Sequence, residues 1–97
     1  MKYYLYILQT IDDTLYTGIA TDPIRRFEEH KSDKIKGAKY TKSHPPKEIV
    51  YLDSFEDKSS ASKEEYRIKK TLTRKEKLTL IKENKEKTKN LLNFLTK

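Results

Sequence analysis

The alternation of hydrophobic and polar side chains predicts three β-strands in the first part of the chain. Residues 3–9 and 15–20 are rich in tyrosine, leucine and isoleucine, which favour strands. Residues 10–13 between them contain two adjacent aspartates and predict a turn, so that the two strands form a hairpin. The apolar run over residues 49–55 predicts a third strand.

Capping signals predict the helices. Asp22 and Pro23 are suited to the N-cap and the first helical position of a helix that ends near His30 or Lys31. The polar residues from Ser32 to Pro46 then predict a loop, and loops of that length in compact domains are usually functional or disordered.

Two further helices are expected after the third strand. The second helix should end near Thr71, and the candidates for its N-cap are Ser59, Ser60 and Ser62. Thr73 and Glu76 form a capping-box pattern that opens the third helix. The predicted order is ββαβαα, which indicates an α+β domain with a three-stranded antiparallel sheet flanked by helices.

The chain is expected to divide into a domain over residues 1–84 and a basic and apolar tail over residues 85–97. The tail carries an apolar cluster at helical spacing: Leu91, Leu92, Phe94 and Leu95. We expect this tail either to be less ordered than the domain or to be ordered by docking of the cluster. The same cluster could instead contact a protein partner or a second copy of the chain.

Charge is unevenly distributed. The net charge is +7, yet residues 1–57 hold 9 basic and 10 acidic residues, whereas residues 58–97 hold 13 basic and 5 acidic ones. Residues 31–47 add six lysines against a single aspartate. Two basic regions beside an aromatic core indicate a surface that binds a polyanion such as nucleic acid. The alternative is a lysine-rich surface that only contacts solvent.

Several classes of site are excluded by composition. The chain has no cysteine, which rules out disulfides, thiolate zinc sites and a cysteine nucleophile. Two histidines are too few for a histidine metal cluster. No apolar run reaches the roughly 18 residues that span a bilayer, and the tyrosine-rich start does not resemble a signal peptide. We therefore expect a cytoplasmic protein without a membrane partner.

The hairpin brings two tyrosines together. Since side chains alternate between the faces of a strand, a turn centred on Ile11 pairs Tyr6 with Tyr16 and Tyr4 with Gly18. Two phenols would then lie side by side, with a gap at Gly18 where a ligand could approach. The alternative is that the tyrosines are only good strand formers and that Gly18 marks a bulge.

Charged side chains on the predicted helices are candidates for phosphate binding, proton transfer and metal binding. Arg26 and His30 lie four residues apart on the first helix, an arrangement that suits phosphate binding and proton transfer, although a solvated basic face is the alternative. Either Glu64 or Glu65 on the second helix could hold a divalent cation, which prefers oxygen ligands. The alternative for each glutamate is an exposed helical position.

Together these residues resemble the GIY-YIG nuclease domain, and in particular its small stand-alone bacterial members, over about residues 2–82. The resemblance is carried by Tyr4-Leu5-Tyr6, Leu15-Tyr16-Thr17-Gly18-Ile19, Arg25-Arg26-Phe27-Glu28-Glu29-His30, Lys36-Gly37-Ala38-Lys39-Tyr40-Thr41 and Glu65-Tyr66-Arg67-Ile68-Lys69. Tyr4-Leu5 stands where the motif has Gly-Ile, Thr17 stands where it has Ile, and Ile19 stands where many members carry lysine.

The resemblance implies an endonuclease that hydrolyses DNA phosphodiesters with one divalent cation, Mg²⁺ or Mn²⁺. Tyr6 and Tyr16 match the motif tyrosines, one of which positions or deprotonates the attacking water. Arg26 matches the arginine at the scissile phosphate, and His30 matches a position near the same site. Glu65 matches the metal ligand, with Glu64 as second choice.

Substrate contacts are expected from Gly18, Arg25, Lys36, Lys39 and Lys42. A nuclease of this kind could be selective for DNA structure, since no second DNA-binding domain is evident. Two other functions compete with it: a non-catalytic nucleic-acid-binding module with the same fold, and a small interaction protein that uses residues 91–95. Only the nuclease requires the tyrosines, Arg26 and Glu65 to converge on one site.

Overall fold

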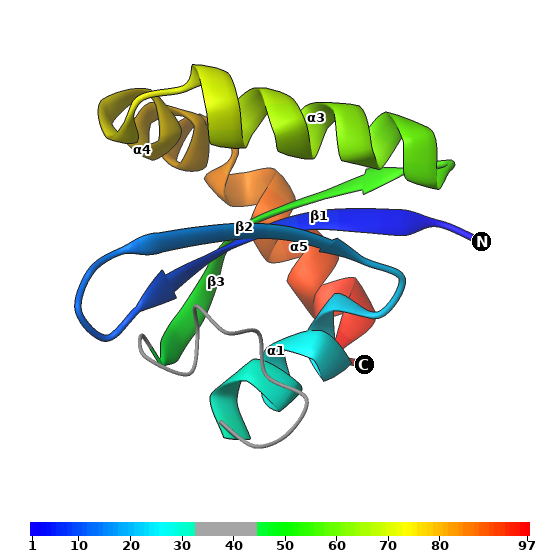
Figure 1. Cartoon of the computed structure of the whole chain (residues 1–97). Coiled ribbons are helices and arrows are strands. Elements are labelled where there is room, and N and C mark those ends of the chain that lie inside the picture. Colours follow the sequence, from blue (N-terminus) through cyan, green and yellow to red (C-terminus); the bar gives the residue numbers. More distant parts are fainter. Residues whose placement is uncertain (33–44) are drawn as a thin grey trace.

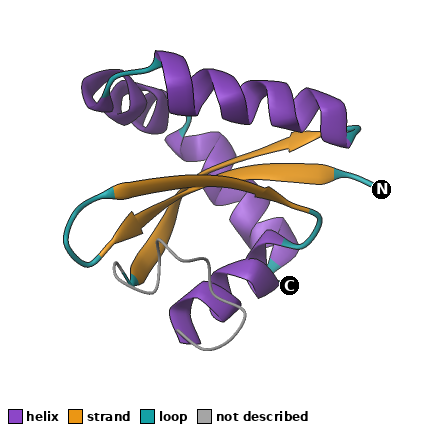
Figure 2. Cartoon of the chain, in the orientation of Figure 1, coloured by secondary structure: helices purple, strands orange, loops and turns teal. Residues whose placement is uncertain are grey.

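The structure of the chain is a computed structural model that describes residues 1–32 and 45–97. Its elements are β1 (Tyr3–Thr10), β2 (Leu15–Ala20), α1 (Pro23–Ser32), β3 (Pro46–Phe55), α3 (Lys58–Thr71), α4 (Arg74–Glu83) and α5 (Lys85–Leu95) (Figures 1 and 2). The predicted α+β class and the order ββαβαα are confirmed, and a further helix, α5, follows them.

The three strands form one antiparallel sheet in the order β2-β1-β3. Within the hairpin, Tyr6 is paired with Gly18 and Leu8 with Tyr16. The predicted pairing of Tyr6 with Tyr16 is therefore wrong by two residues. A shift of two leaves every side chain on its expected face, because the faces alternate with a period of two.

The turn explains this register. The amide of Thr10 donates to the carbonyl of Thr14 at 2.9 Å, and the two hydroxyls lie 2.6 Å apart. These contacts centre the turn on Asp12 and not on Ile11. Asp13 closes the turn in the left-handed region with φ of 68°, a conformation that aspartate tolerates better than most residues and that ends many three-residue hairpin loops.

Helices cover both faces of the sheet, with α3 and α4 on one side and α1 and α5 on the other (Figure 1). The face toward α1 and α5 buries Tyr4, Tyr6, Leu8 and Leu52, against which Phe27 and the leucines of α5 pack. The opposite face buries Leu5, Ile7, Tyr51 and Ile68. A bulge in β3 between its pairings with Ile7 and Leu8 moves Ile49 to the first of these faces and Val50 to the second.

Two predicted boundaries are corrected. The third strand begins at Pro46, three residues before the predicted start at Ile49, at a first-strand position where proline costs no ladder bond. The N-cap of α3 is Asp57, whose carboxylate accepts from the amide of Ser60 at 2.7 Å. The predicted serines thus lie inside the helix, because an aspartate already caps it.

Other local signals are confirmed. Asp22 accepts from the amide of Arg25 at 3.2 Å at the start of α1, and the capping box of Thr73 and Glu76 opens α4 with both of its hydrogen bonds. The predicted loop from Ser32 to Pro46 lies largely outside the described residues.

The tail forms helix α5, which docks on the sheet, so the second of the two expected outcomes holds. Leu91, Leu92 and Leu95 pack against the core, whereas Phe94 is 70% exposed. The buried hydroxyl of Thr88 accepts from the amide of Leu52 at 3.1 Å and ties α5 to β3. None of the described helices is long and apolar enough to cross a membrane.

Candidate functional site

Tyr6 and Tyr16 lie on the same face of the sheet. Their ring centroids are 6.5 Å apart, which is a diagonal contact across the hairpin rather than a direct pair. Tyr6 is only 2% exposed, whereas Tyr16 on the edge strand β2 is partly exposed. Of the two phenols, Tyr16 is therefore the one with better access to a substrate.

Gly18 lies beneath the phenol of Tyr6. A Cβ atom at Gly18 would come within 2.6 Å of the Tyr6 hydroxyl oxygen and within 2.8 Å of Cζ. The expected gap at Gly18 is thus filled by the ring of Tyr6, and the glycine serves to admit that ring. This is a close approach inside the chain rather than an opening for a ligand backbone.

Helix α1 brings His30 and Arg26 to the tyrosines. The imidazole of His30 is fully buried, with its Nε2 atom 3.3 Å from the Tyr6 hydroxyl and its ring edge-on to Tyr16 at 5.4 Å. The guanidinium of Arg26, one turn earlier, acts on Tyr6 through its charge and a side-chain hydrogen bond. The four-residue spacing on α1 therefore places both side chains at the same phenol.

Burial controls the protonation of these groups. Desolvation, assisted by Tyr16, raises the pKa of Tyr6 well above its usual value, and Arg26 only partly opposes this. Desolvation and the charge of Arg26 lower the pKa of His30, while Glu29 opposes them. At neutral pH Tyr6 is a neutral phenol and His30 a neutral imidazole, so Tyr6 is suited to hydrogen bonding and not to action as a phenolate.

Two ion pairs surround the phenols. Arg26 Nη1 lies 3.1 Å from Glu29 Oε1, and the Glu29 side chain is 19% exposed. On α3, Lys69 Nζ lies 3.2 Å from Glu65 Oε2 and 5.8 Å from the ring centroid of Tyr16. The charge of Glu65 also contributes to the raised pKa of Tyr6. Glu65 therefore belongs to the same cluster as Arg26 and the two tyrosines.

Glu64 has a different environment. Its carboxylate accepts from Arg67 Nε at 2.8 Å and from Arg67 Nη2 at 2.6 Å, and this hydrogen bonding lowers its pKa. Adjacent residues point about 100° apart around a helix, so only one of the two glutamates can face the tyrosines. The fully buried Ile68 fixes the rotation of α3 against the sheet.

A divalent cation would find two carboxylates in this cluster, Glu65 on α3 and Glu29 on α1. No group of three or more histidine, cysteine, aspartate or glutamate side chains suited to a metal occurs within residues 1–32 and 45–97. The donor chemistry of Glu65 still fits Mg²⁺ or Mn²⁺, because such ions commonly keep several waters and bind one or two carboxylates together with substrate phosphates. Glu65 would then be the protein ligand.

The candidate residues divide into three groups. The structure brings together Tyr6, Tyr16, Arg26, His30 and Glu65. Arg25 is exposed on α1, one residue before Arg26 in the sequence, whereas Lys36, Lys39 and Lys42 lie outside the described residues. Two cluster members were not predicted, Lys69 and Glu29, although their spacing from Glu65 and Arg26 is that of helical ion pairs and could have indicated them.

Comparison with known proteins places the chain in a family. A family model described as the GIY-YIG catalytic domain matches residues 2–79. A UPF0213 protein of Syntrophus aciditrophicus is 48% identical over 85 residues, which cover 88% of this chain and 95% of that protein. A UPF0213 protein of Staphylococcus aureus is 48% identical over 82 residues, with 84% and 96% covered.

A solved structure has the same fold. The solution NMR structure of the UPF0213 protein BH0048 from Bacillus halodurans aligns with a TM-score of 0.56 and 39% sequence identity, covering 88% of this chain and 87% of that one. Because the family model spans most of the described elements and the relatives match over nearly their full length, the chain belongs to the GIY-YIG domain family and is similar to the UPF0213 proteins.

Proposed function

We propose that this protein is an endonuclease that hydrolyses phosphodiester bonds in DNA with the help of one divalent cation, Mg²⁺ or Mn²⁺. The observation that supports this most directly is the convergence of Tyr6, Tyr16 and Arg26 with Glu65, which come from four separate elements. A structural role alone would not need an arginine, a glutamate and two phenols around one point at the edge of a sheet.

Hydrolysis requires a water oxygen to bond to phosphorus while the P–O bond of the leaving nucleotide breaks and its oxygen acquires a proton. Arg26 is suited to neutralise the charge that develops on the phosphate oxygens. Tyr16, the more exposed phenol, is assigned to hold the attacking water. A cation on Glu65 would supply Lewis acidity and lower the pKa of bound water.

Tyr6 and His30 are assigned positioning roles. Tyr6 is buried and stays protonated at neutral pH, since burial raises its pKa. Its hydroxyl lies 3.3 Å from Nε2 of His30, and a neutral imidazole can accept a hydrogen bond at that atom. The pair would thereby fix the guanidinium of Arg26, which also contacts Tyr6.

We assign substrate binding to positively charged side chains that contact the phosphates of DNA. Arg25 is exposed on α1 beside Arg26 in the sequence, and Lys36, Lys39 and Lys42 remain proposed contacts from the sequence. Phosphate contacts of this kind give affinity without reading the base sequence. A structure-selective activity is therefore favoured over a sequence-specific one. Gly18 would contribute indirectly, because it admits the ring of Tyr6.

A non-catalytic nucleic-acid-binding module is the competing function. It is supported by Lys69, which already neutralises Glu65 at 3.2 Å without any other cation. In that case the cluster would present only positive charge to a phosphate, and binding would not depend on a metal.

The test is incubation of the purified protein with duplex, single-stranded and branched DNA and with RNA, in Mg²⁺, Mn²⁺ or EDTA. The nuclease proposal expects cleavage of at least one DNA substrate with a metal and none in EDTA. Tyr16→Phe and Arg26→Ala should each lower the cleavage rate, by about 10²-fold or more for the arginine. Binding without cleavage on every substrate would favour the non-catalytic module instead.

A further inference from the structure

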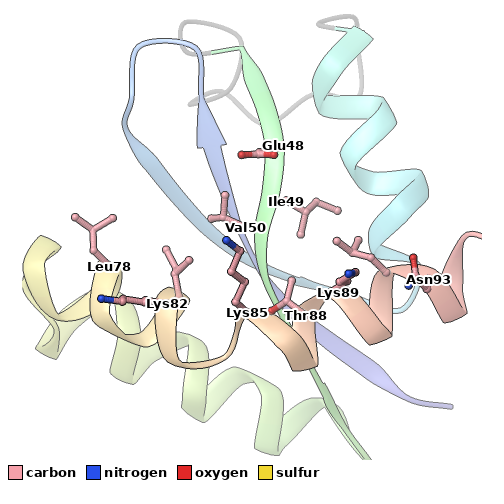
Figure 3. A pocket seen from close by; sticks show the side chains of 11 residues that line it. Glu48, Ile49, Val50, Leu78, Lys82, Lys85, Thr88, Lys89 and Asn93 are labelled. Carbon is pink, nitrogen blue, oxygen red and sulfur yellow. The ribbon is translucent and has the colours of Figure 1, made fainter.

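A groove lies at the edge of the sheet opposite to the tyrosine cluster. It has a volume of about 480 Å³ and runs between β3 and the helices α4 and α5 (Figure 3). Aliphatic side chains from all three elements form its floor: Ile49, Val50, Ile81 and Leu92. Leu78 at its margin is 44% exposed. The groove is thus an accessible apolar surface within the size range of binding pockets.

Lysines line the helix side of this groove. Lys82 lies in the last turn of α4, and Lys85 and Lys89 lie four residues apart on α5, opposite Ile49 and Val50 of the strand (Figure 3). Among the lining residues that the structure describes, only Glu48 is acidic. Within the described part of the chain these three lysines form no ion pair, whereas the neighbouring Lys87 pairs with Asp53 at 2.6 Å. The groove therefore combines an apolar floor with uncompensated positive charge.

The strand beside the groove is an edge strand of the sheet. Near Leu52, helix α5 closes this edge, because the hydroxyl of Thr88 accepts the outward-pointing amide of Leu52 at 3.1 Å. At Ile49 and Val50 the strand borders the groove instead. Open strand edges pair readily with another extended segment.

We propose that this groove binds an extended acidic segment of a partner protein. The aliphatic side chains of that segment would lie on the floor, and its carboxylates would face Lys82, Lys85 and Lys89. Successive side chains of an extended segment point to opposite sides, so a segment that alternates aliphatic and acidic residues presents one kind on each side. This site is separate from the proposed nuclease cluster, and it gives the protein a means of being recruited by a partner.

A peptide fits this groove better than a nucleic acid. Surfaces that bind single strands stack bases on aromatic side chains, and no aromatic residue among residues 1–32 and 45–97 lines the groove. Phosphates alone would use the lysines but leave the aliphatic floor exposed to water. A second copy of the chain is disfavoured by its net charge of +7.

The experiment titrates the full-length protein with a fluorescein-labelled decapeptide of alternating glutamate and valine. Two control peptides replace valine by serine or glutamate by lysine, and a single-stranded oligonucleotide serves as the nucleic-acid probe. We expect the glutamate–valine peptide to bind, with amide chemical-shift changes centred on Ile49, Thr88 and Leu92. Both control peptides should bind at least about tenfold more weakly, since each loses one of the two interactions.

Charge-reversal variants localise the site. Lys85→Glu combined with Lys89→Glu should weaken peptide binding by about tenfold. The matched control, Lys63→Glu combined with Lys70→Glu on the exposed surface of α3, makes the same change in net charge and should leave most of the affinity. Shift changes outside the groove, equal loss in both double variants, or preferential binding of the oligonucleotide at Ile49 and Leu92 would overturn the proposal.

Discussion

Gly18 and Tyr6 face each other across the hairpin, and the space that a Cβ atom of Gly18 would need is taken by the phenol of Tyr6. The hydroxyl oxygen would be 2.6 Å from that atom and Cζ 2.8 Å. Tyr6 is 2% exposed, and its hydroxyl lies 3.3 Å from the buried His30. The phenol therefore has little room to move away, and the glycine fixes its position.

Gly18→Ala should lower the free energy of unfolding by about 1–3 kcal/mol, as overpacking of a filled core does. It should also lower DNA cleavage, because the ring of Tyr6 is displaced from Arg26. Urea denaturation measures the first effect and a nicking assay the second.

Tyr6→Phe supplies the control for this prediction. It removes the hydroxyl oxygen, the atom nearest to the new methyl group, so the double variant should be less destabilised than the sum of the single variants. Strict additivity would mean that Gly18 and Tyr6 do not collide in the variant.

The free energy of unfolding should decrease as the pH is lowered, because of His30. Burial lowers the pKa of His30 below its ordinary value of 6.5. Below pH 6.5 the imidazole is therefore protonated in the unfolded chain but stays neutral in the folded one. The stabilisation is complete above that pH and is lost as the pH falls toward the folded pKa, by at most about 1.4 kcal/mol per pH unit.

His30→Gln isolates this effect in urea denaturation at pH 7.5, 6.5 and 5.5. The variant keeps His44, so the difference from the wild type reports His30 alone. The curve of the free energy of unfolding against pH should become flatter. Identical slopes for the two proteins would show that His30 is protonated as readily in the fold as in the unfolded chain.

Local patterns allowed much of this fold to be predicted from the sequence. Strand parity placed Tyr6 and Tyr16 on one face even though the predicted register was wrong, since an error of two residues preserves the face. The register itself depends on Asp13 adopting a φ of 68°. The sequence does not show which of the two adjacent aspartates adopts this conformation. The cap of α3 was missed because several capping residues compete there, and Asp57 precedes the serines.

Contacts between distant elements were not predictable in the same way. The spacing of Glu65 and Lys69 indicates a helical ion pair, but that this pair approaches Tyr16 depends on how α3 packs on the sheet. The apolar spacing of the last residues indicated a helix but not its partner. Docking of Leu91 and Leu92 on the sheet leaves Phe94 as the exposed member of that cluster.

DNA binding should weaken steeply as salt rises, because the proposed contacts are to phosphates and release counterions. Fluorescence anisotropy with a labelled duplex at several KCl concentrations gives the slope of log affinity against log salt. Arg25→Gln should reduce that slope by about one and weaken binding to all sequences alike. An affinity that does not change with salt would contradict an electrostatic surface.

Glu65→Ala should abolish metal-dependent cleavage while leaving the fold and DNA binding nearly intact. Loss of the sole carboxylate assigned to the cation removes its Lewis acidity and its activation of water, so we expect a loss of at least about 10²-fold in rate. Binding should remain within about twofold, because it comes from many phosphate contacts.

Glu64→Ala is a closely matched control for this substitution. Each variant removes one partially exposed helical ion pair, with Arg67 for Glu64 and with Lys69 for Glu65. Such pairs contribute roughly 0–1 kcal/mol, and alanine is the better helix former, so neither change should unfold the protein. The two variants differ mainly in the side of α3 from which the carboxylate is removed, since Glu65 raises the pKa of Tyr6 and Glu64 does not contribute to it. Equal losses of cleavage would indicate a general effect of negative charge on α3, and undiminished cleavage by Glu65→Ala would show that another group holds the metal.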